Sequence, residues 1–165
     1  MVYYVNCPEV IHSHEYYMNK ALKEAKKAYS KDEAPIGAVI VKEGRIIARG
    51  HNERELKEDS TLHAEMTAIR KACRKLSSWR LNECDMYVTL EPCAMCAGAL
   101  VQARVRRLYI GTADPKAGAA GSVINILEVD KFNHKVEAIF GILESECSKI
   151  LKDFFKELRT KKTDR

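Results

Sequence analysis

Two short stretches of this 165-residue chain contain residue types that bind transition metals. One is the H-A-E segment of residues 63–65, and the other is the P-C-A-M-C segment of residues 92–96. His63 supplies an imidazole, and Cys93 and Cys96 supply two thiols, which are ligands that zinc prefers. Three protein ligands leave one of the four tetrahedral positions open, as in catalytic zinc sites. The spacing therefore predicts one catalytic Zn2+ ion per chain.

A Cys-x-x-Cys pair by itself leaves other interpretations open: a redox pair, half of a structural zinc site, or chance spacing in an apolar helix. A structural site needs a fourth Cys or His at short spacing, and neither stretch has one nearby. A thioredoxin-like pair follows the first strand of a βαβ unit, whereas this pair lies mid-chain. Pro92 fits a first helical turn, whose N–H groups would favour ionised thiols. We therefore favour catalytic zinc.

Glu65 lies two residues after His63, where it can reach a water molecule in the open position more easily than the ion itself. A carboxylate so placed can serve as the general base and acid for a metal-activated water. The alternative role is that of a carboxylate stabilised by the dipole of a helix start.

Hydrophobic periodicity predicts the elements that position these motifs. We expect helices and strands in the following order: a helix from Ser13, its N-cap, to Pro35; a hairpin of strands 36–41 and 45–50 with a Glu43-Gly44 turn; a loop over 52–60; a helix capped by Ser60 or Thr61 with His63 and Glu65 in its first turn; strand 85–90; helix 94–103; strands 107–111 and 135–141; and a helix over 143–159.

This order predicts an α/β fold in which a single five-stranded mixed sheet is covered by helices on both faces, a three-layer α/β/α sandwich. No linker or repeat divides the chain, so we expect one domain over residues 1–165. Within it, residues 1–12 form an N-terminal arm and residues 160–165 a basic tail.

Composition excludes several classes of protein. Hydrophobic residues make up 46% of the chain and charged residues 31%, as in ordinary globular domains, and no apolar run approaches the ~18–20 residues of a membrane span. The first residues lack the order of a secretory signal, and six cysteines are not needed as disulfides at this length, so we expect a reducing cytoplasm. The net charge of +5 is compatible with a polyanionic partner or simply with a solubilising surface.

The combined pattern H-x-E…P-C-x-x-C is the signature of zinc deaminases. The chain resembles the cytidine-deaminase-like superfamily, and more closely the bacterial tRNA adenosine deaminases, which convert the wobble adenosine of an arginine tRNA to inosine. The zinc motif assigns only the superfamily, whereas the glycine-rich loop and the D-F-F segment indicate the tRNA branch. The matching segments are P-I-G-A-V-I-V (35–41), H-A-E (63–65), T-L-E-P-C-A-M-C-A-G-A (89–99), D-P-K-A-G-A-A-G-S (114–122), F-N-H (132–134) and D-F-F (153–155).

The resemblance implies a cytidine-deaminase-like fold, a homodimer and a tRNA anticodon stem-loop as partner. It implies that a zinc hydroxide attacks C6 of adenine while Glu65 shuttles protons. Asn52 would contact the substrate, although an asparagine there is also an ordinary turn residue, and the amide of Ala64 would help to hold the base. The chain departs from the family at His51, where an aromatic residue is common.

The target base must leave its stack to be attacked, and single-stranded loops are bound by stacking and backbone contacts. The residues that the resemblance assigns to such contacts are Asp114, Lys116, Gly118, Phe155 and Arg159. Phe154 is a further candidate, with ordinary core packing as the alternative. Glu91 either orients the backbone near the second metal motif or supports a ligand through a hydrogen bond.

Three functions remain open from the sequence. The first is deamination of the wobble adenosine in tRNA. The second is the same chemistry on free guanine, cytosine or a nucleoside, for which a basic last helix has no use. The third is a non-enzymatic zinc or RNA-binding module, which the presence of Glu65 and the missing fourth ligand disfavour.

Overall fold

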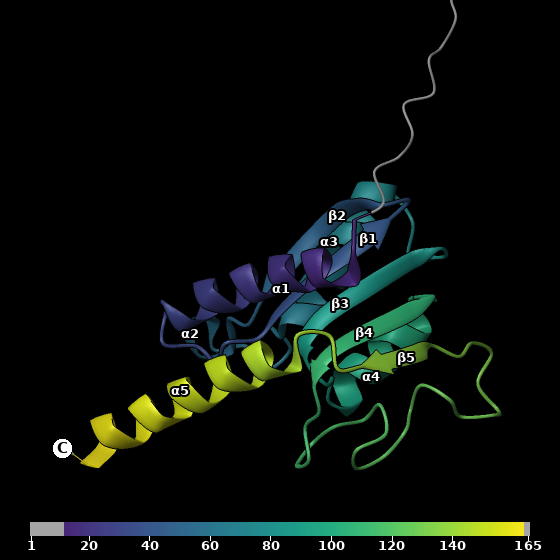
Figure 1. The fold of residues 1–165 in the computed structure, drawn as a ribbon. Coiled ribbons are helices and arrows are strands. Elements are labelled where there is room, and N and C mark those ends of the chain that lie inside the picture. The colour runs from purple at the N-terminus through teal and green to yellow at the C-terminus, as the bar shows by residue number, and fades with distance from the viewer. Residues whose placement is uncertain (1–11, 164–165) are drawn as a thin grey trace, which may run out of the picture.

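The computed structural model describes residues 12–163, so most of the expected N-terminal arm and residues 164–165 of the expected tail lie outside it. A helix and a β-hairpin come first, followed by two helices and then a mixture of strands and helices (Figure 1). In chain order, the elements are α1 (His14–Tyr29), β1 (Gly37–Lys42), β2 (Arg45–His51), α2 (Arg54–Lys57), α3 (Ala64–Leu76), β3 (Cys84–Leu90), α4 (Ala94–Gln102), β4 (Arg107–Thr112), β5 (Glu137–Phe140) and α5 (Glu144–Thr163).

The five strands form one sheet in the order β2-β1-β3-β4-β5. Strand β1 is antiparallel to both β2 and β3, whereas β3, β4 and β5 are parallel to one another. Parallel strands need crossover connections, and α4 supplies the one between β3 and β4. The predicted mixed sheet and three-layer architecture are confirmed.

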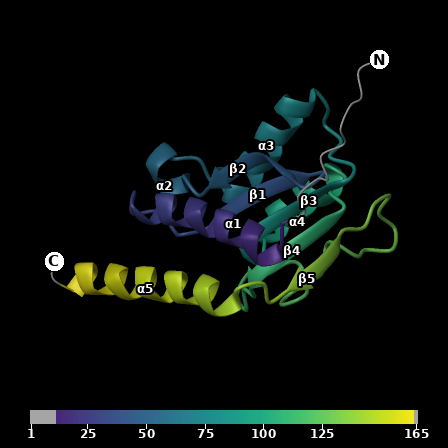
Figure 2. The same cartoon turned by 45° about the horizontal axis from the view of Figure 1, so that its top comes forward.

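The two faces of the sheet bury different side chains of the same strands, because successive residues of a strand point to opposite faces. Ala38 and Ile40 of β1 pack with α3 and α4, whereas Val39 and Val41 pack with α1. In Figures 1 and 2, α1 and α5 lie on one face and α3 and α4 on the other. Burial on both faces explains why β1 reads as a continuous apolar run instead of an alternating one.

The helix starts differ in how well local sequence predicts them. Ser13 caps α1 as predicted, and its hydroxyl accepts a hydrogen bond from the Tyr16 amide. The predicted cap of α3 at Ser60 or Thr61 is wrong, because α3 begins one residue after His63, which is its N-cap. Thr61 instead donates from both its amide and its hydroxyl to Asp59, and this turn delays the helix. The predicted loop over 52–60 also contains the short helix α2.

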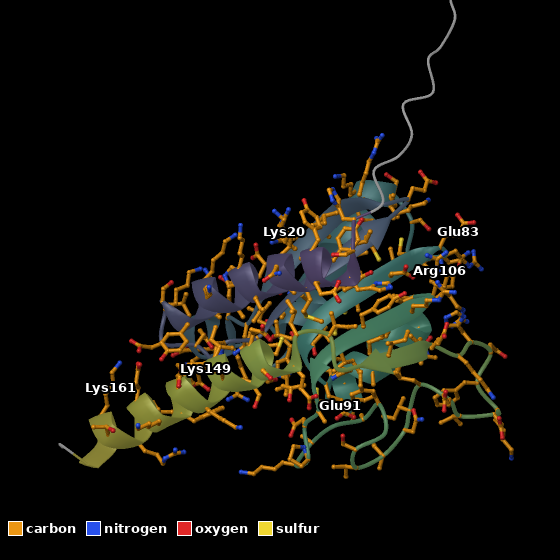
Figure 3. The ribbon with its side chains drawn as sticks, in the orientation of Figure 1. Lys20, Glu83, Glu91, Arg106, Lys149 and Lys161 are labelled. Atoms are coloured by element: carbon orange, nitrogen blue, oxygen red, sulfur yellow. The ribbon has the colours of Figure 1, made fainter. Side chains whose placement is uncertain are left out.

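Helix α5 continues to Thr163, so residues 160–163 of the expected tail are helical. It extends past the edge of the sheet (Figures 1 and 2). Lys161, labelled near the end of this helix in Figure 3, pairs with Asp32 at 2.9 Å. Phe154 packs edge-to-face on Tyr29 and is 6% exposed, so it belongs to the core, whereas Phe155 is 44% exposed. None of the helices in residues 12–163 combines the length and hydropathy that a membrane crossing requires.

The β1–β2 turn has positive φ angles at both central residues, 49° at Glu43 and 73° at Gly44. Such two-residue hairpin turns favour Asn-Gly, because asparagine tolerates the left-handed region better than glutamate. We expect Glu43→Asn to raise the free energy of unfolding by about 0.5–1 kcal/mol and Gly44→Ala to lower it by about 1–2 kcal/mol. Urea denaturation measures both. Each variant is the control for the other, because the two are expected to change the free energy of unfolding in opposite directions. A change of the same sign in both would contradict the turn geometry.

Candidate metal centre

The metal-binding motifs lie where two helices begin beside the ends of strands. His63 is the N-cap of α3 and Cys93 is the N-cap of α4, and neither uses its side chain to cap its helix. A Cβ atom added to Gly50 near the end of β2 would lie 2.2 Å from the carbonyl oxygen of Ala64. Only glycine permits this close approach, which brings the end of β2 against the first turn of α3.

The three predicted ligands converge in space. His63 Nδ1 lies 3.6 Å from the Sγ atoms of both Cys93 and Cys96, and the three ligand atoms lie within 4.8 Å of one another. Tetrahedral zinc, with Zn–S of about 2.3 Å and Zn–N of about 2.0–2.1 Å, separates a nitrogen and a sulfur ligand by about 3.6 Å. The donor set therefore fits a zinc ion in both chemistry and spacing. Within residues 12–163 it provides three ligands, the number expected of a catalytic site.

The electrostatics of this cluster favour a cation. Hydrogen bonds from Cys96 and His63 lower the pKa of Cys93 to about 3. The hydrogen bond to Cys93 and burial raise the pKa of Cys96, and the bond to Cys93 also raises the pKa of His63. One thiolate is thus stabilised by two neighbouring protons. A divalent ion bound at the same atoms would replace those protons, since metals bind thiolate and neutral imidazole.

Glu65 is 4% exposed and lies within the cluster, where its carboxylate interacts with the thiol of Cys96. Burial raises the pKa of Glu65 to about 7. The Glu65 side chain is therefore next to the ligand atoms without being one of the three that converge. This is the arrangement the sequence predicts for a group that exchanges protons with a water molecule at the open position.

Of the predicted substrate residues, Ala64 directly follows His63, whereas Asn52 lies one residue before Glu53, whose amide donates to the Leu62 carbonyl at 3.0 Å. The amide of Ala64 is among the first N–H groups of α3, which have no acceptor within the helix. Asn52 directly follows β2 and is 5% exposed. Its side-chain amide donates to Glu33 Oε2 at 3.1 Å. Local sequence does not indicate Glu33, since an acidic residue after Lys31 and Asp32 looks like part of a solvated turn.

Glu91 holds the glycine-rich loop against the second metal motif. Its carboxylate accepts hydrogen bonds from the amides of Asp114 (2.9 Å), Ala120 (3.0 Å) and Ser122 (3.0 Å), and from the Ser122 hydroxyl. In Figure 3, Glu91 lies among the loops that connect β4 to β5. Burial raises the pKa of Glu91, but these hydrogen bonds outweigh it and hold the pKa below its ordinary value. Of the two predicted roles, orienting the backbone is the one Glu91 performs.

The predicted RNA-contact residues of this loop have different environments. The Asp114 carboxylate accepts from the amides of Lys116 and Ala117, so it shapes its own turn, whereas the Lys116 side chain is exposed. Gly118 is buried, and a Cβ atom there would lie 2.3 Å from Glu91 Oε2. Gly118 therefore lets the carboxylate reach the backbone of the loop.

The structure does not join the predicted α5 residues to the metal cluster. The Phe155 ring packs edge-to-face on Phe154, and Arg159 is exposed on the same helix. His51, which departs from the family pattern, binds Glu24 through Nδ1 at 3.1 Å and Lys31 through Nε2 at 3.1 Å. His51 therefore ties the end of β2 to α1 instead of facing the cluster.

Comparison with known proteins identifies the class of this site. The sequence profile of the MafB19-like deaminases matches residues 12–159. The tRNA-specific adenosine deaminase of Bacillus subtilis (strain 168) is 53% identical over 148 residues, which cover 90% of this chain and 92% of that protein. The enzyme of the same name from Aquifex aeolicus (strain VF5) is 49% identical over 145 residues, 88% of this chain and 95% of the other.

A solved structure from a study of A-to-I editing by tRNA:A34 deaminases at the wobble position of transfer RNA also matches this fold. It superposes with a TM-score of 0.80 at 47% identity and covers 82% of this chain and 99% of that one. These relationships confirm the resemblance that the two motifs and the glycine-rich loop indicated.

We expect purified protein to contain one zinc ion per chain and Cys96→Ser to lose most of it, because a serine hydroxyl does not ionise to replace the thiolate. Elemental analysis after dialysis against a mild chelator measures the content. Cys73→Ser is the matched control, since the Cys73 thiol bonds to the Trp79 carbonyl at 3.7 Å, away from the cluster. Equal zinc in both variants would remove Cys96 from the ligand set.

Glu91→Gln is expected to lower the free energy of unfolding by about 1–3 kcal/mol, because an amide NH2 would face N–H groups that now donate to a carboxylate. Urea denaturation measures the loss, and faster amide hydrogen exchange over residues 114–122 locates it. Ser122→Ala, which removes one of the four hydrogen bonds, should cost about 0.5–1.5 kcal/mol. A larger loss in Ser122→Ala than in Glu91→Gln would contradict the role assigned to the carboxylate.

The lowered pKa of Glu91 also gives this stabilisation a pH dependence. The contribution is complete above the pKa of the unfolded state and is lost as the pH falls through the folded-state pKa. The difference in unfolding free energy between the wild type and Glu91→Gln should therefore stay constant near neutral pH and shrink in acid. Denaturation curves from about pH 7 down to about pH 3 test this sign.

Proposed function

This chain belongs to the MafB19-like deaminase family, and we propose that it deaminates the wobble adenosine of a tRNA anticodon to inosine, with arginine tRNA as its substrate. The observation that carries the proposal is the convergence of His63 Nδ1 with the sulfurs of Cys93 and Cys96, with the buried Glu65 carboxylate beside them. Identity of 49–53% to two tRNA-specific adenosine deaminases over most of the chain supports the tRNA substrate.

His63, Cys93 and Cys96 would hold the ion, one per chain. Zinc in such a site supplies a water nucleophile at neutral pH. The reaction adds the water oxygen to C6 of adenine and breaks the bond between C6 and the 6-amino nitrogen, so adenosine and water become inosine and ammonia.

Glu65 moves the protons that this reaction requires. Its carboxylate accepts a proton from the attacking water and donates it to ring N1 of adenine. It then accepts the second proton of that oxygen and delivers it to the departing amine. Burial at 4% exposure keeps bulk water from competing for these transfers.

The remaining groups bind the flipped base and the RNA. Asn52 and the Ala64 amide would contact the base. The loop bearing Asp114, Lys116 and Gly118, which Glu91 holds beside the second metal motif, would contact the RNA. Phe155 and Arg159 of α5 would contact nucleotides farther from the reacting base. We also propose, on the family resemblance, that the chain acts as a homodimer in the cytoplasm.

We expect zinc-loaded protein to form inosine in an arginine-tRNA anticodon stem-loop and to release no ammonia from free adenosine, guanine or cytosine. Glu65→Gln should retain its zinc but lose about a hundredfold or more in turnover, because a carboxamide cannot accept and return the proton. Nucleoside analysis by mass spectrometry and an ammonia assay measure the products.

Glu137→Gln is the matched control, since it removes an exposed carboxylate that pairs with Arg107 on the sheet edge. Normal turnover of Glu65→Gln would exclude Glu65 from the mechanism. Reaction on free bases alone would favour the small-molecule deaminase, and no product from any substrate would favour a non-enzymatic module.

A further inference from the structure

The side chain of Asn52 is hydrogen-bonded to the fully buried carboxylate of Glu33. Glu33, in the connection between α1 and β1, is 0% exposed. Its Oε2 accepts a hydrogen bond from Asn52 Nδ2 at 3.1 Å, and its Oε1 accepts one from the Leu56 amide at 2.6 Å. Among the described residues, no lysine, arginine or histidine pairs with Glu33. These two N–H groups are therefore what stabilises the buried carboxylate.

This contact fixes the direction of the Asn52 amide. A carboxylate only accepts hydrogen bonds, so Asn52 must turn its NH2 group toward Glu33 and its carbonyl oxygen away. Within residues 12–163, the only fully buried side-chain polar atom without a partner is Thr67 Oγ1. Asn52 Oδ1 has no hydrogen-bond partner among the described residues, so it is not one of the fully buried atoms and keeps some contact with solvent. It is therefore an acceptor of fixed direction directly after β2.

We propose that Glu33 is a positioning residue that turns Asn52 Oδ1 toward the substrate, where this oxygen accepts a hydrogen bond from a substrate donor. The proposal rests on the proposed function. An adenosine inside an RNA chain has esterified 3′ and 5′ oxygens, so its polar hydrogens are those of the 6-amino group and the 2′-hydroxyl. The amino group is the one that leaves, and the 2′-hydroxyl is therefore the donor we assign to Asn52 Oδ1. Glu33 then contributes, through Asn52, to the choice of RNA over DNA.

Glu33→Gln should reverse this polarity with little change in shape. The Leu56 amide is a fixed donor and takes the glutamine oxygen, so the glutamine NH2 faces Asn52. The Asn52 amide must then rotate by 180° so that its oxygen accepts from the glutamine. Its NH2 group would face the substrate donor, and two donors cannot form a hydrogen bond with each other. We expect kcat/KM on the anticodon stem-loop to fall about tenfold or more, with zinc content unchanged.

A second substitution should repair the first. In the double variant Glu33→Gln/Asn52→Asp, one oxygen of the introduced carboxylate accepts from the glutamine and the other faces the substrate. We expect it to recover activity above Glu33→Gln alone. Asn52→Asp by itself places two carboxylates in contact and should lose activity. A purely structural role for Glu33 predicts that the double variant is worse than either single one. Asp32→Asn, which removes the neighbouring exposed carboxylate, is the matched control and should behave as the wild type.

Two further measurements separate this inference from the proposed function. Hydrogen exchange of the Asn52 side-chain NH2, followed by NMR, should be slow in the wild type and faster in Glu33→Gln, whether or not the protein is active. A stem-loop with 2′-deoxyadenosine at the target position should react more slowly with the wild type, and Glu33→Gln should lose that preference.

Normal kinetics and unchanged exchange in Glu33→Gln would overturn the positioning role. Equal reaction of ribose and deoxyribose substrates with the wild type would overturn the assignment of the 2′-hydroxyl. If the wild type forms no inosine in any RNA, the proposed function fails, and the exchange measurement alone still decides whether Glu33 orients Asn52.

Discussion

The three ligand atoms meet because two helices begin at neighbouring points beside the strand ends. His63 and Cys93 occupy the N-cap positions, where serine, threonine or aspartate commonly accepts the free N–H groups of the first turn. Here the N-cap side chains face each other instead, with 3.6 Å between the imidazole nitrogen and the sulfur. The free N–H groups and positive ends of α3 and α4 therefore border the cluster, and they favour anionic sulfur.

Two buried carboxylates hold separate segments of the chain in place by accepting several hydrogen bonds each. Glu33 is 0% exposed and Glu91 is 2% exposed, and N–H and O–H donors from loops satisfy both. Backbone amides in buried loops need acceptors, and a carboxylate can supply several at once. Glu33 thereby joins Asn52 to α2, and Glu91 joins the second metal motif to the glycine-rich loop. The glycine-rich loop, which is expected to touch RNA, is thus held by a residue that lies two positions before Cys93.

Helix α5 packs against the end of α1 and the α1–β1 connection, which contains Glu33. Phe154 packs on Tyr29 at the end of α1, and Lys161 pairs with Asp32, one residue before Glu33. The α1–β1 connection thus contacts α5 on its exposed side and Asn52 on its buried side.

The sequence by itself determined the ligand set, the order of strands and helices, and the single mixed sheet. These features depend on spacing and periodicity within short windows: a Cys-x-x-Cys pair, a Glu43-Gly44 turn and the apolar run of β1 are visible locally.

Only the tertiary structure decided what the buried carboxylates do. Glu33 meets Asn52 across 19 residues, and Glu91 meets Ala120 across 29, so no local pattern distinguishes either from a glutamate in solvent. The same holds for the cap of α3, where Asp59 competes for Thr61, and for the neighbours Phe154 and Phe155, of which only one faces Tyr29. Whether a polar group is buried depends on which distant segment packs over it, and that is a property of the assembled fold.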